Sequence, residues 1–196
     1  MAESARAHMT IDEFFAWEEN QPDKHELVDG LPLRMMAGAT NAHNDVVINV
    51  IREFSVRLRG GPCRPFNGDG AVETKRGQIR RPDAGVECGP RQASAMMARL
   101  AKVVVEVLSP STRDFDTYRK TGEYKLVPGL DRILLIDPNK PEIFMWSRDA
   151  AREWDETTVR GLDATIDMPE IGIALPLGEI YRDIEFPTEL RLVPGE

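Results

Sequence analysis

Cysteine and histidine are scarce in this 196-residue sequence, which contains two of the first and three of the second. Cys63 and Cys88 lie 25 positions apart, neither in a CxxC pair nor close to a histidine. This pattern favours neither a zinc site nor a disulfide framework. We therefore predict that both cysteines stay reduced and act as small buried hydrophobic residues.

Long apolar runs are also missing. The longest, such as Val103–Val105 and Ile133–Ile136, fall far short of the roughly 18 residues that cross a bilayer. Residues 1–9 lack the apolar centre and the small-residue cleavage site of a signal peptide. We therefore expect no membrane span and a cytoplasmic location.

Basic residues are outnumbered, with 25 Lys and Arg against 33 Asp and Glu and a net charge of −8. This balance argues against a grip on nucleic acid made of many contacts between basic side chains and phosphates. A nuclease still fits, because a few carboxylates can hold a divalent cation that reverses the local charge. The length indicates one domain over residues 10–186, with a flexible segment at 1–9 and a tail at 187–196.

The first third of the chain predicts a helix, a hairpin and a second helix. A capping box at residues 10–13 begins a short helix that runs to about residue 19. Asp29-Gly30 predicts a type I′ hairpin turn, which places Glu26 on a strand. Thr40 can cap a long helix that ends at Gly60-Gly61.

The rest of the chain alternates between strands and one more long helix. Between Cys63 and Cys88, four short β segments separated by glycines predict a meander. Lys102–Leu108 is almost continuously apolar, which is typical of a central strand buried on both faces. Ser109 and Thr112 are assigned to the turn and to the cap of a helix from about Arg113 to Val127. Two further strands (132–136 and 142–146), a hairpin layer and a short helix at 177–181 complete the predicted α/β (α+β) fold.

One carboxylate, Glu106, lies inside the predicted central strand. Burial of an unpaired ionised acid costs several kcal/mol, so Glu106 must face a cleft, pair with a cation or bind a metal. If Asp83 lies on an adjacent strand, the two acids can share one hard divalent cation such as Mg²⁺. Asp116, Lys120 and Tyr124 follow i, i+4, i+8 spacing and share one helix face. Lys120 could then reach the strand end and stabilise a charged phosphoryl transition state.

The order of these residues resembles the Uma-type family of restriction endonucleases, a domain-of-unknown-function family in the PD-(D/E)XK nuclease superfamily. The resemblance covers roughly Ile11 to Asp183, and the run Glu106–Thr112 is its most specific part. It rests on Glu26-Leu27-Val28-Asp29-Gly30, His43, Arg81-Pro82-Asp83, Val104–Thr112, Asp116, Lys120 and Tyr124, in that order.

The resemblance implies a restriction-endonuclease-like core, a mixed β-sheet flanked by helices, with additional N-terminal and C-terminal β-hairpins. It also implies a Mg²⁺- or Mn²⁺-dependent endonuclease acting on DNA. Asp83 and Glu106 would be the metal ligands, with the carbonyl of Val107 as an additional candidate. Lys120 would be the catalytic lysine, since Leu108 occupies the superfamily's usual lysine position, and Glu26 would be an auxiliary acid. The substrate-binding candidates are His43, Arg81, Arg113 and Tyr124.

A homodimer is expected, because two sites related by a two-fold axis can cut both strands of a duplex. Simpler roles stand beside each assignment: taken alone, Lys120 fits a solvated helix position and Glu26 the polar face of a hairpin. Arg80 and Arg81 could contact phosphates or neutralise acidic neighbours. Leu108 and the −8 charge motivate a second hypothesis, a catalytically inactive dimeric interaction or DNA-binding module. A hydrolase of small phosphate esters is a third.

Overall fold

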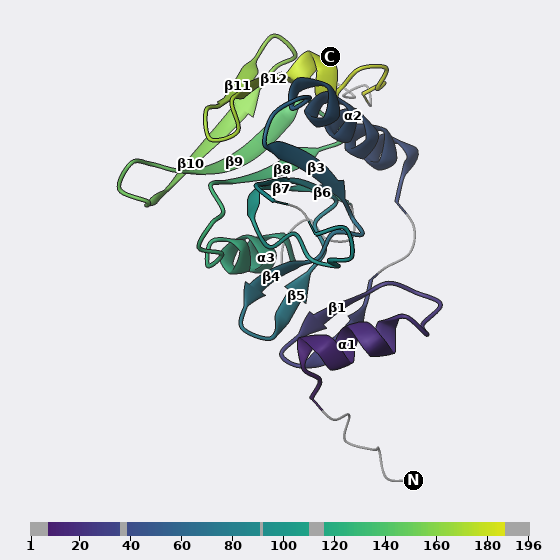
Figure 1. Cartoon of the computed structure of the whole chain (residues 1–196). Helices are drawn as coiled ribbons and strands as arrows, with labels where there is room; N and C mark the ends of the chain where they lie inside the picture. Colours follow the sequence, from purple (N-terminus) through teal and green to yellow (C-terminus); the bar gives the residue numbers. More distant parts are fainter. Residues whose placement is uncertain (1–7, 36–38, 91, 110–115, 187–196) are drawn as a thin grey trace.

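A six-stranded mixed sheet forms the centre of the computed structural model, which describes residues 8–35, 39–90, 92–109 and 116–186 (Figure 1). The strand order is β10-β9-β8-β7-β6-β3. Only β7 and β8 pair in parallel, and every other neighbouring pair is antiparallel. The strands are β3 (Cys63–Asn67), β6 (Ala84–Cys88), β7 (Ala101–Val107), β8 (Arg132–Asp137), β9 (Glu142–Arg148) and β10 (Trp154–Arg160).

A second, four-stranded antiparallel sheet carries the order β2-β1-β5-β4. Its strands are β1 (His25–Val28), β2 (Leu31–Arg34), β4 (Val72–Lys75) and β5 (Gln78–Arg80). The predicted meander between the two cysteines is therefore wrong. Strands β3 and β6 pair with each other, while β4 and β5 leave the main sheet and join the N-terminal hairpin. Strand β5 joins β1 because Leu27 and Ile79 pair with each other and are completely buried in one cluster with Phe14.

The helices follow the local signals of the sequence. Thr10 and Glu13 form the predicted capping box at the start of α1 (Ile11–Glu18), and Thr40 caps α2 (Asn41–Arg57) as predicted. The helix α3 (Asp116–Tyr124) ends three residues before the predicted Val127, and its predicted start at Arg113 lies outside the described residues. Among the described helices, none combines the length and hydropathy of a membrane span.

Both predicted terminal hairpins are present. Asp29 and Gly30 have φ angles of 49° and 77°, as a type I′ turn requires, and they join β1 to β2. Near the C-terminus, β11 (Thr165–Met168) and β12 (Ile173–Pro176) pair as a separate two-stranded sheet, followed by α4 (Leu177–Ile180).

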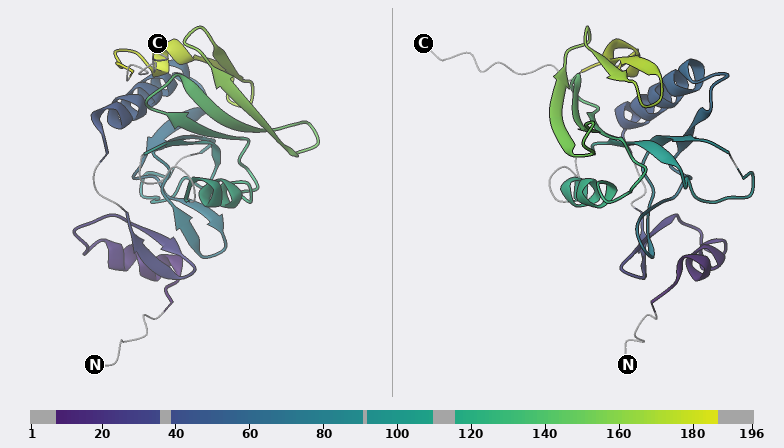
Figure 2. Two further views of the ribbon diagram at one scale, coloured as in Figure 1. Left: turned by 180° about the vertical axis from the view of Figure 1, so that it is seen from behind. Right: turned by 60° about the vertical axis from the view of Figure 1, so that its left-hand side comes forward.

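Alternating residues of β7 divide the core into two layers, one on each face of the main sheet. Val103, Val105 and Val107 pack in a cluster with α2, α4 and the β11–β12 hairpin. Val104 packs on the opposite face with Tyr124 of α3. Figure 2 shows α2 and α3 on opposite sides of the sheet. Because successive side chains of a strand point to opposite faces, Glu106 shares the α3 face with Val104.

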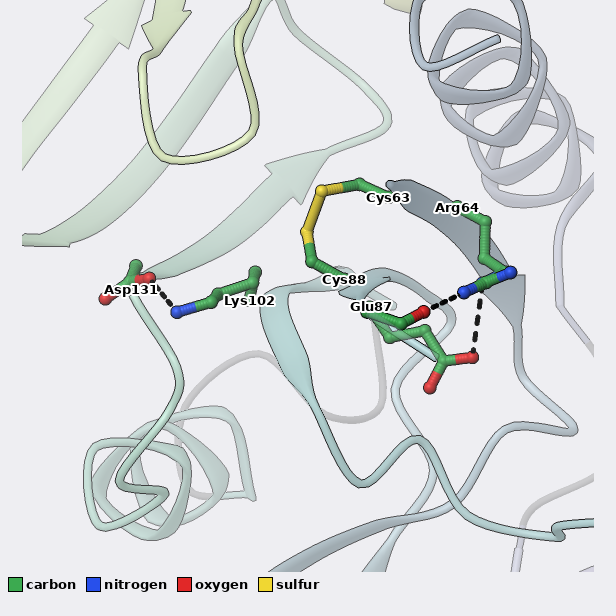
Figure 3. The surroundings of a disulfide bond; sticks show 7 residues. Cys63, Arg64, Glu87, Cys88, Lys102 and Asp131 are labelled. Atoms are coloured by element: carbon green, nitrogen blue, oxygen red, sulfur yellow. Dashed lines mark hydrogen bonds and ion pairs between the residues drawn. A yellow bond between two sulfur atoms is a disulfide. The ribbon is translucent and has the colours of Figure 1, made fainter. Parts of the chain in front are cut away.

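Cys63 and Cys88 lie directly opposite each other in the β3–β6 pair and are joined in a disulfide (Figure 3). The prediction that both cysteines stay reduced is therefore wrong for this structure, although both contribute to the hydrophobic cluster under α2. Their separation in sequence gives no sign that antiparallel pairing will bring the two side chains together. The disulfide fastens the edge strand β3 to β6, the strand that follows Asp83.

Candidate active site

Asp83 and Glu106 lie side by side at one end of the main sheet. Asp83 immediately precedes β6, and the first pair of the β6–β7 register joins Ala84 to Val105. The next step of the same antiparallel register places Asp83 beside Glu106. The backbone N–H of Val107 donates a 2.7 Å hydrogen bond to Asp83 Oδ2, which fixes the Asp83 carboxylate against β7. The adjacency that the sequence argument required is therefore present.

Lys120 and Tyr124 of α3 both reach Glu106 from the face of the sheet that α3 covers. The ammonium of Lys120 lies 3.4 Å from Glu106 Oε1, and the hydroxyl of Tyr124 donates a 2.7 Å hydrogen bond to the same oxygen. One helical turn separates the two donors, so a single helix face presents both. Asp116 begins the same helix, but its side chain lies outside the described part.

Glu106 is held in an environment that resists ionisation. Burial raises the pKa of Glu106 to about 7, and the nearby carboxylates of Asp83 and Glu26 act in the same direction. Lys120 and Tyr124 act against this rise. For Lys120, burial favours the neutral amine, but Glu106 and Glu26 outweigh it and raise the pKa above its ordinary value. Lys120 is therefore an ammonium at neutral pH.

Glu26 completes the surroundings of Lys120 from the hairpin strand β1. Its side chain is almost fully buried, and its Oε1 lies 3.1 Å from the Lys120 ammonium. Burial alone would raise the pKa of Glu26, but Lys120 and Arg80 outweigh it and lower the pKa below the ordinary value. Glu26 is therefore a buried carboxylate, and Lys120 bridges it to Glu106.

Sequence reasoning missed the roles of Arg80 and Glu123. Arg80 donates to Glu26 Oε2 at 2.7 Å and to both carboxylate oxygens of Glu123, at 2.6 and 2.9 Å. The three residues come from β5, β1 and α3 and are far apart in the chain. No spacing in the sequence connects them. The nearest sequence signal is the position of Glu123 on the helix that also carries Lys120 and Tyr124.

His43, in the first turn of α2, contacts the site from the other face of the sheet. Its Nε2 lies 3.4 Å from Asp83 Oδ2, and no described residue forms a hydrogen bond with its buried Nδ1. The hydrogen bond with Asp83 is the largest cause of a raised pKa at His43, opposed by burial. His43 is therefore placed beside Asp83.

The other predicted substrate-binding residues are Arg81, Tyr124 and Arg113, and each has different surroundings. Arg81 donates to the backbone carbonyls of His25 and Asp69 and pairs with Glu18, so its guanidinium ties α1 and the β3–β4 turn to the sheet. A phosphate contact by Arg81 would require these bonds to be replaced. Tyr124 is fully buried and directs its hydroxyl at Glu106. Arg113 lies outside the described residues.

The donor set at this end of the sheet fits a hard divalent cation. Among the described residues, no three His, Cys, Asp or Glu side chains form a group able to hold a metal ion by themselves. Mg²⁺, however, commonly takes one or two carboxylates and fills its other positions with water and phosphate oxygens. The contacts described above engage Asp83 at Oδ2 and Glu106 at Oε1. Each acid thus has a second oxygen that it can offer to a cation.

Comparison with known proteins identifies the family of this chain. The sequence model of the Uma2 family, described as "Putative restriction endonuclease", matches residues 11–178. The chain belongs to the Uma2 family. It is 30% identical over 180 residues to the uncharacterized protein slr1290 of Synechocystis, covering 91% of this chain and 94% of the relative. A second Synechocystis protein, the uncharacterized sll1609, is 27% identical over 163 residues, covering 81% and 92%.

The fold of this Uma2 chain is similar to that of a solved structure. A crystal structure of "a putative nuclease belonging to DUF820" from Anabaena variabilis matches with a TM-score of 0.68 and 17% identity. The match covers 88% of this chain and 97% of the other. At this identity the likeness concerns the fold alone. The predicted fold, a mixed sheet flanked by helices with added hairpins, is therefore confirmed, as is the family resemblance.

Proposed function

We propose that this Uma2 chain is a divalent-metal-dependent endonuclease that hydrolyses phosphodiester bonds in DNA. The observation that carries the proposal is the meeting of Asp83, Glu106 and Lys120 at one end of the main sheet. Two adjacent carboxylates and an ammonium are the groups that metal-assisted phosphodiester hydrolysis needs. Membership of a family described as "Putative restriction endonuclease" supports the same proposal.

Asp83 and Glu106 would hold the cation, and the Val107 carbonyl is an additional candidate ligand. When bound, a divalent cation supplies Lewis-acid activation of water and neutralises phosphate charge. The environment of Glu106 supports this assignment, because burial and the neighbouring Asp83 raise its pKa to about 7. Glu106 and Asp83 would both be ionised when they hold a cation, because its charge would offset their mutual repulsion.

The other residues of the site hold and orient the reacting groups. The Lys120 ammonium lies beside Glu106, where it can stabilise the negative charge that develops on the phosphate. Glu26 keeps Lys120 at this position through its Oε1. The Tyr124 hydroxyl fixes the orientation of the Glu106 carboxylate. His43 lies beside Asp83 and would be within reach of a phosphate at this site.

The test is cleavage of supercoiled plasmid by the purified chain with Mg²⁺, Mn²⁺ or EDTA. We expect nicking that requires the metal and is lost in Asp83→Asn, Glu106→Gln and Lys120→Ala. Asp131→Asn is the matched control, because Asp131 also pairs with a lysine, Lys102, at 2.9 Å (Figure 3), and Lys102 lies at the opposite end of β7 from Glu106. This control should keep the wild-type rate, and circular dichroism should show that every variant is folded.

Calorimetric titration with Mn²⁺ supplies a second measurement that does not depend on the choice of DNA. The wild type and Asp131→Asn should bind the ion, and Asp83→Asn and Glu106→Gln should bind it far more weakly. No cleavage of plasmid, linear duplex or single-stranded DNA, together with no binding of Mn²⁺, would overturn the proposed function.

A further inference from the structure

Arg80 is an almost fully enclosed charged group of the site, as is its partner Glu26. Only 4% of its side chain is exposed, and all three guanidinium nitrogens donate to carboxylates. Nε and Nη2 form a two-pronged pair with Glu123, while Nη1 donates to Glu26. Such planar, charge-assisted pairs fix geometry as well as charge. Arg80 therefore locks a residue of β1 and a residue of α3 into one arrangement.

The two oxygens of Glu26 are used for different purposes. Oε2 accepts from Arg80 at 2.7 Å, and Oε1 accepts from the backbone N–H of Arg81 at 3.1 Å. These two anchors set the plane of the carboxylate and leave Oε1 facing Lys120 at 3.1 Å. The Lys120 ammonium is then shared between Glu26 and Glu106, which lies 3.4 Å away. The position of Lys120 thus depends on a carboxylate that Arg80 orients.

We propose that Arg80 is a positioning residue of the active site, which holds Lys120 against Glu106 by orienting Glu26 while Glu123 anchors Arg80 itself. This inference rests on the proposed function, since Lys120 matters for catalysis only if the chain is a nuclease. Arg80 does not touch the reacting atoms. It acts through Glu26 on the group that does.

The site needs a cation at position 80 to balance the charge of its carboxylates. Three carboxylates, Glu26, Glu106 and Glu123, surround two cations, the buried Arg80 and the partly buried Lys120. Without Arg80, Glu26 keeps only the Arg81 N–H and the Lys120 ammonium as partners among the described contacts. An unsatisfied buried carboxylate attracts the nearest available cation. Lys120 should then move toward Glu26 and away from Glu106.

Shape, and not charge alone, explains why the cation is an arginine. A lysine at position 80 carries the same charge but has no planar fork, so it can satisfy Glu26 or Glu123 but not both with the observed geometry. Glu123 has a second partner, since Arg119 lies 3.4 Å from its Oε1, but Arg119 is about half exposed. Among the described residues, Lys120 is the only other cation paired with Glu26. Arg80→Lys is therefore the informative substitution.

Arg132→Lys is the matched control for Arg80→Lys. Arg132 is also buried and pairs through Nε and Nη2 with both oxygens of one carboxylate, Glu170, at 2.6 and 3.1 Å. The side chains of this pair are 9% and 13% exposed, against 4% and 11% for Arg80 and Glu123. The two substitutions therefore remove similar interactions. Of these two arginines, Arg80 is the one that contacts Glu26.

Kinetics of plasmid nicking provide the first measurement. We expect Arg80→Lys to lower kcat about tenfold or more, because a misplaced catalytic group is costly, with KM for DNA unchanged. Arg132→Lys should lose stability but keep kcat within about twofold of the wild type. Full activity of Arg80→Lys would overturn the inference.

Crystal structures of the wild type and of Arg80→Lys provide a measurement that does not require activity. We expect the Lys120 ammonium to leave Glu106 in the variant and to stay near Glu26. If it remains beside Glu106 at the wild-type distance, the inference is wrong even if the chain is a nuclease. If the wild type neither cleaves DNA nor binds Mn²⁺ but Lys120 moves as expected, the proposed function fails and the positioning contact stands.

Glu123→Gln keeps the inference testable if Arg80→Lys does not fold. The amide retains one acceptor for Arg80 but removes the charge and the two-pronged pair. The substitution should displace Arg80 and lower kcat in the same direction by a smaller factor. An unchanged position of Lys120 in this variant, with Arg80 visibly displaced, would contradict the inference.

Discussion

The Tyr124 hydroxyl and the Glu106 carboxylate form a 2.7 Å hydrogen bond between α3 and the central strand β7. Tyr124 is fully buried, and its pKa lies well above the ordinary value because of burial and the nearby Glu106. It is therefore a permanent donor that orients the acid. This contact joins the helix that carries Lys120 to the strand that carries Glu106, so packing and chemistry depend on the same pair.

Tyr124→Phe should lower both stability and activity. The ring is kept, but a buried carboxylate loses its donor, which costs about 1–3 kcal/mol. We expect the nicking rate to fall about tenfold, because the Glu106 carboxylate is no longer oriented. Tyr181→Phe is the control, since the buried Tyr181 hydroxyl contacts Asp137 and Glu142 and not the site. It should lose stability alone, and equal losses of activity in both variants would contradict the assignment.

The stability of the metal-free chain should depend on pH through Glu106. Burial raises the folded-state pKa of Glu106 from 4.5 to about 7, so between these values the unfolded chain binds fewer protons than the folded chain. The free energy of unfolding therefore falls as pH rises through this window, by at most about 3 kcal/mol. Below about pH 4.5, Glu106 is protonated in both states and this loss of stability is absent.

Glu106→Gln isolates this effect, because the amide keeps an acceptor for Tyr124 and does not titrate. The difference in free energy of unfolding, wild type minus variant, should decrease between about pH 5 and pH 7. Urea denaturation in EDTA at several pH values measures it. A difference that stays level across the window would show that Glu106 ionises at its ordinary pKa.

The Cys63–Cys88 disulfide should stabilise the region that carries Asp83. The bridge closes a loop of 25 residues, which includes β4, β5 and Asp83. Loop-closure entropy for that length gives about 3.5 kcal/mol. Reduction, or Cys63→Ala with Cys88→Ala, should lower the denaturation midpoint accordingly. Thiol titration of the unfolded, unreduced protein checks the premise, and two free thiols per chain would refute it.

Gly85 should not tolerate a larger side chain. A Cβ at this position of β6 would lie 2.2 Å from Phe66 Cζ and 2.7 Å from the carbonyl oxygen of Val103. Gly85→Ala should therefore destabilise the chain by about 1–3 kcal/mol and disturb the neighbouring Asp83. Gly122→Ala is the matched control, because nothing lies within 4 Å of its Cβ on α3. That variant should gain about 0.5–1 kcal/mol, as thermal denaturation can show.

Several local features of this fold are determined by interactions between residues that are close in the sequence. The capping box at Thr10, the Asp29-Gly30 turn and the Thr40 cap each depend on neighbouring residues, and all three are present in the structure. The apolar run of β7 predicts the interior position of this strand in the sheet. The one acid within the run, Glu106, is thereby identified as a candidate site residue. Local hydrogen bonding and side-chain periodicity fix these features before any distant contact forms.

The tertiary structure decided which distant segments meet. Strands β4 and β5 joined the N-terminal hairpin because Leu27 and Ile79 are buried together, and the cysteines met because β3 pairs with β6. Arg80 faces Glu26 and Glu123 for a similar reason, since buried charges must be compensated by whichever opposite charges the fold brings near. Burial and charge compensation act between residues tens of positions apart, and no local pattern in the chain records such pairings.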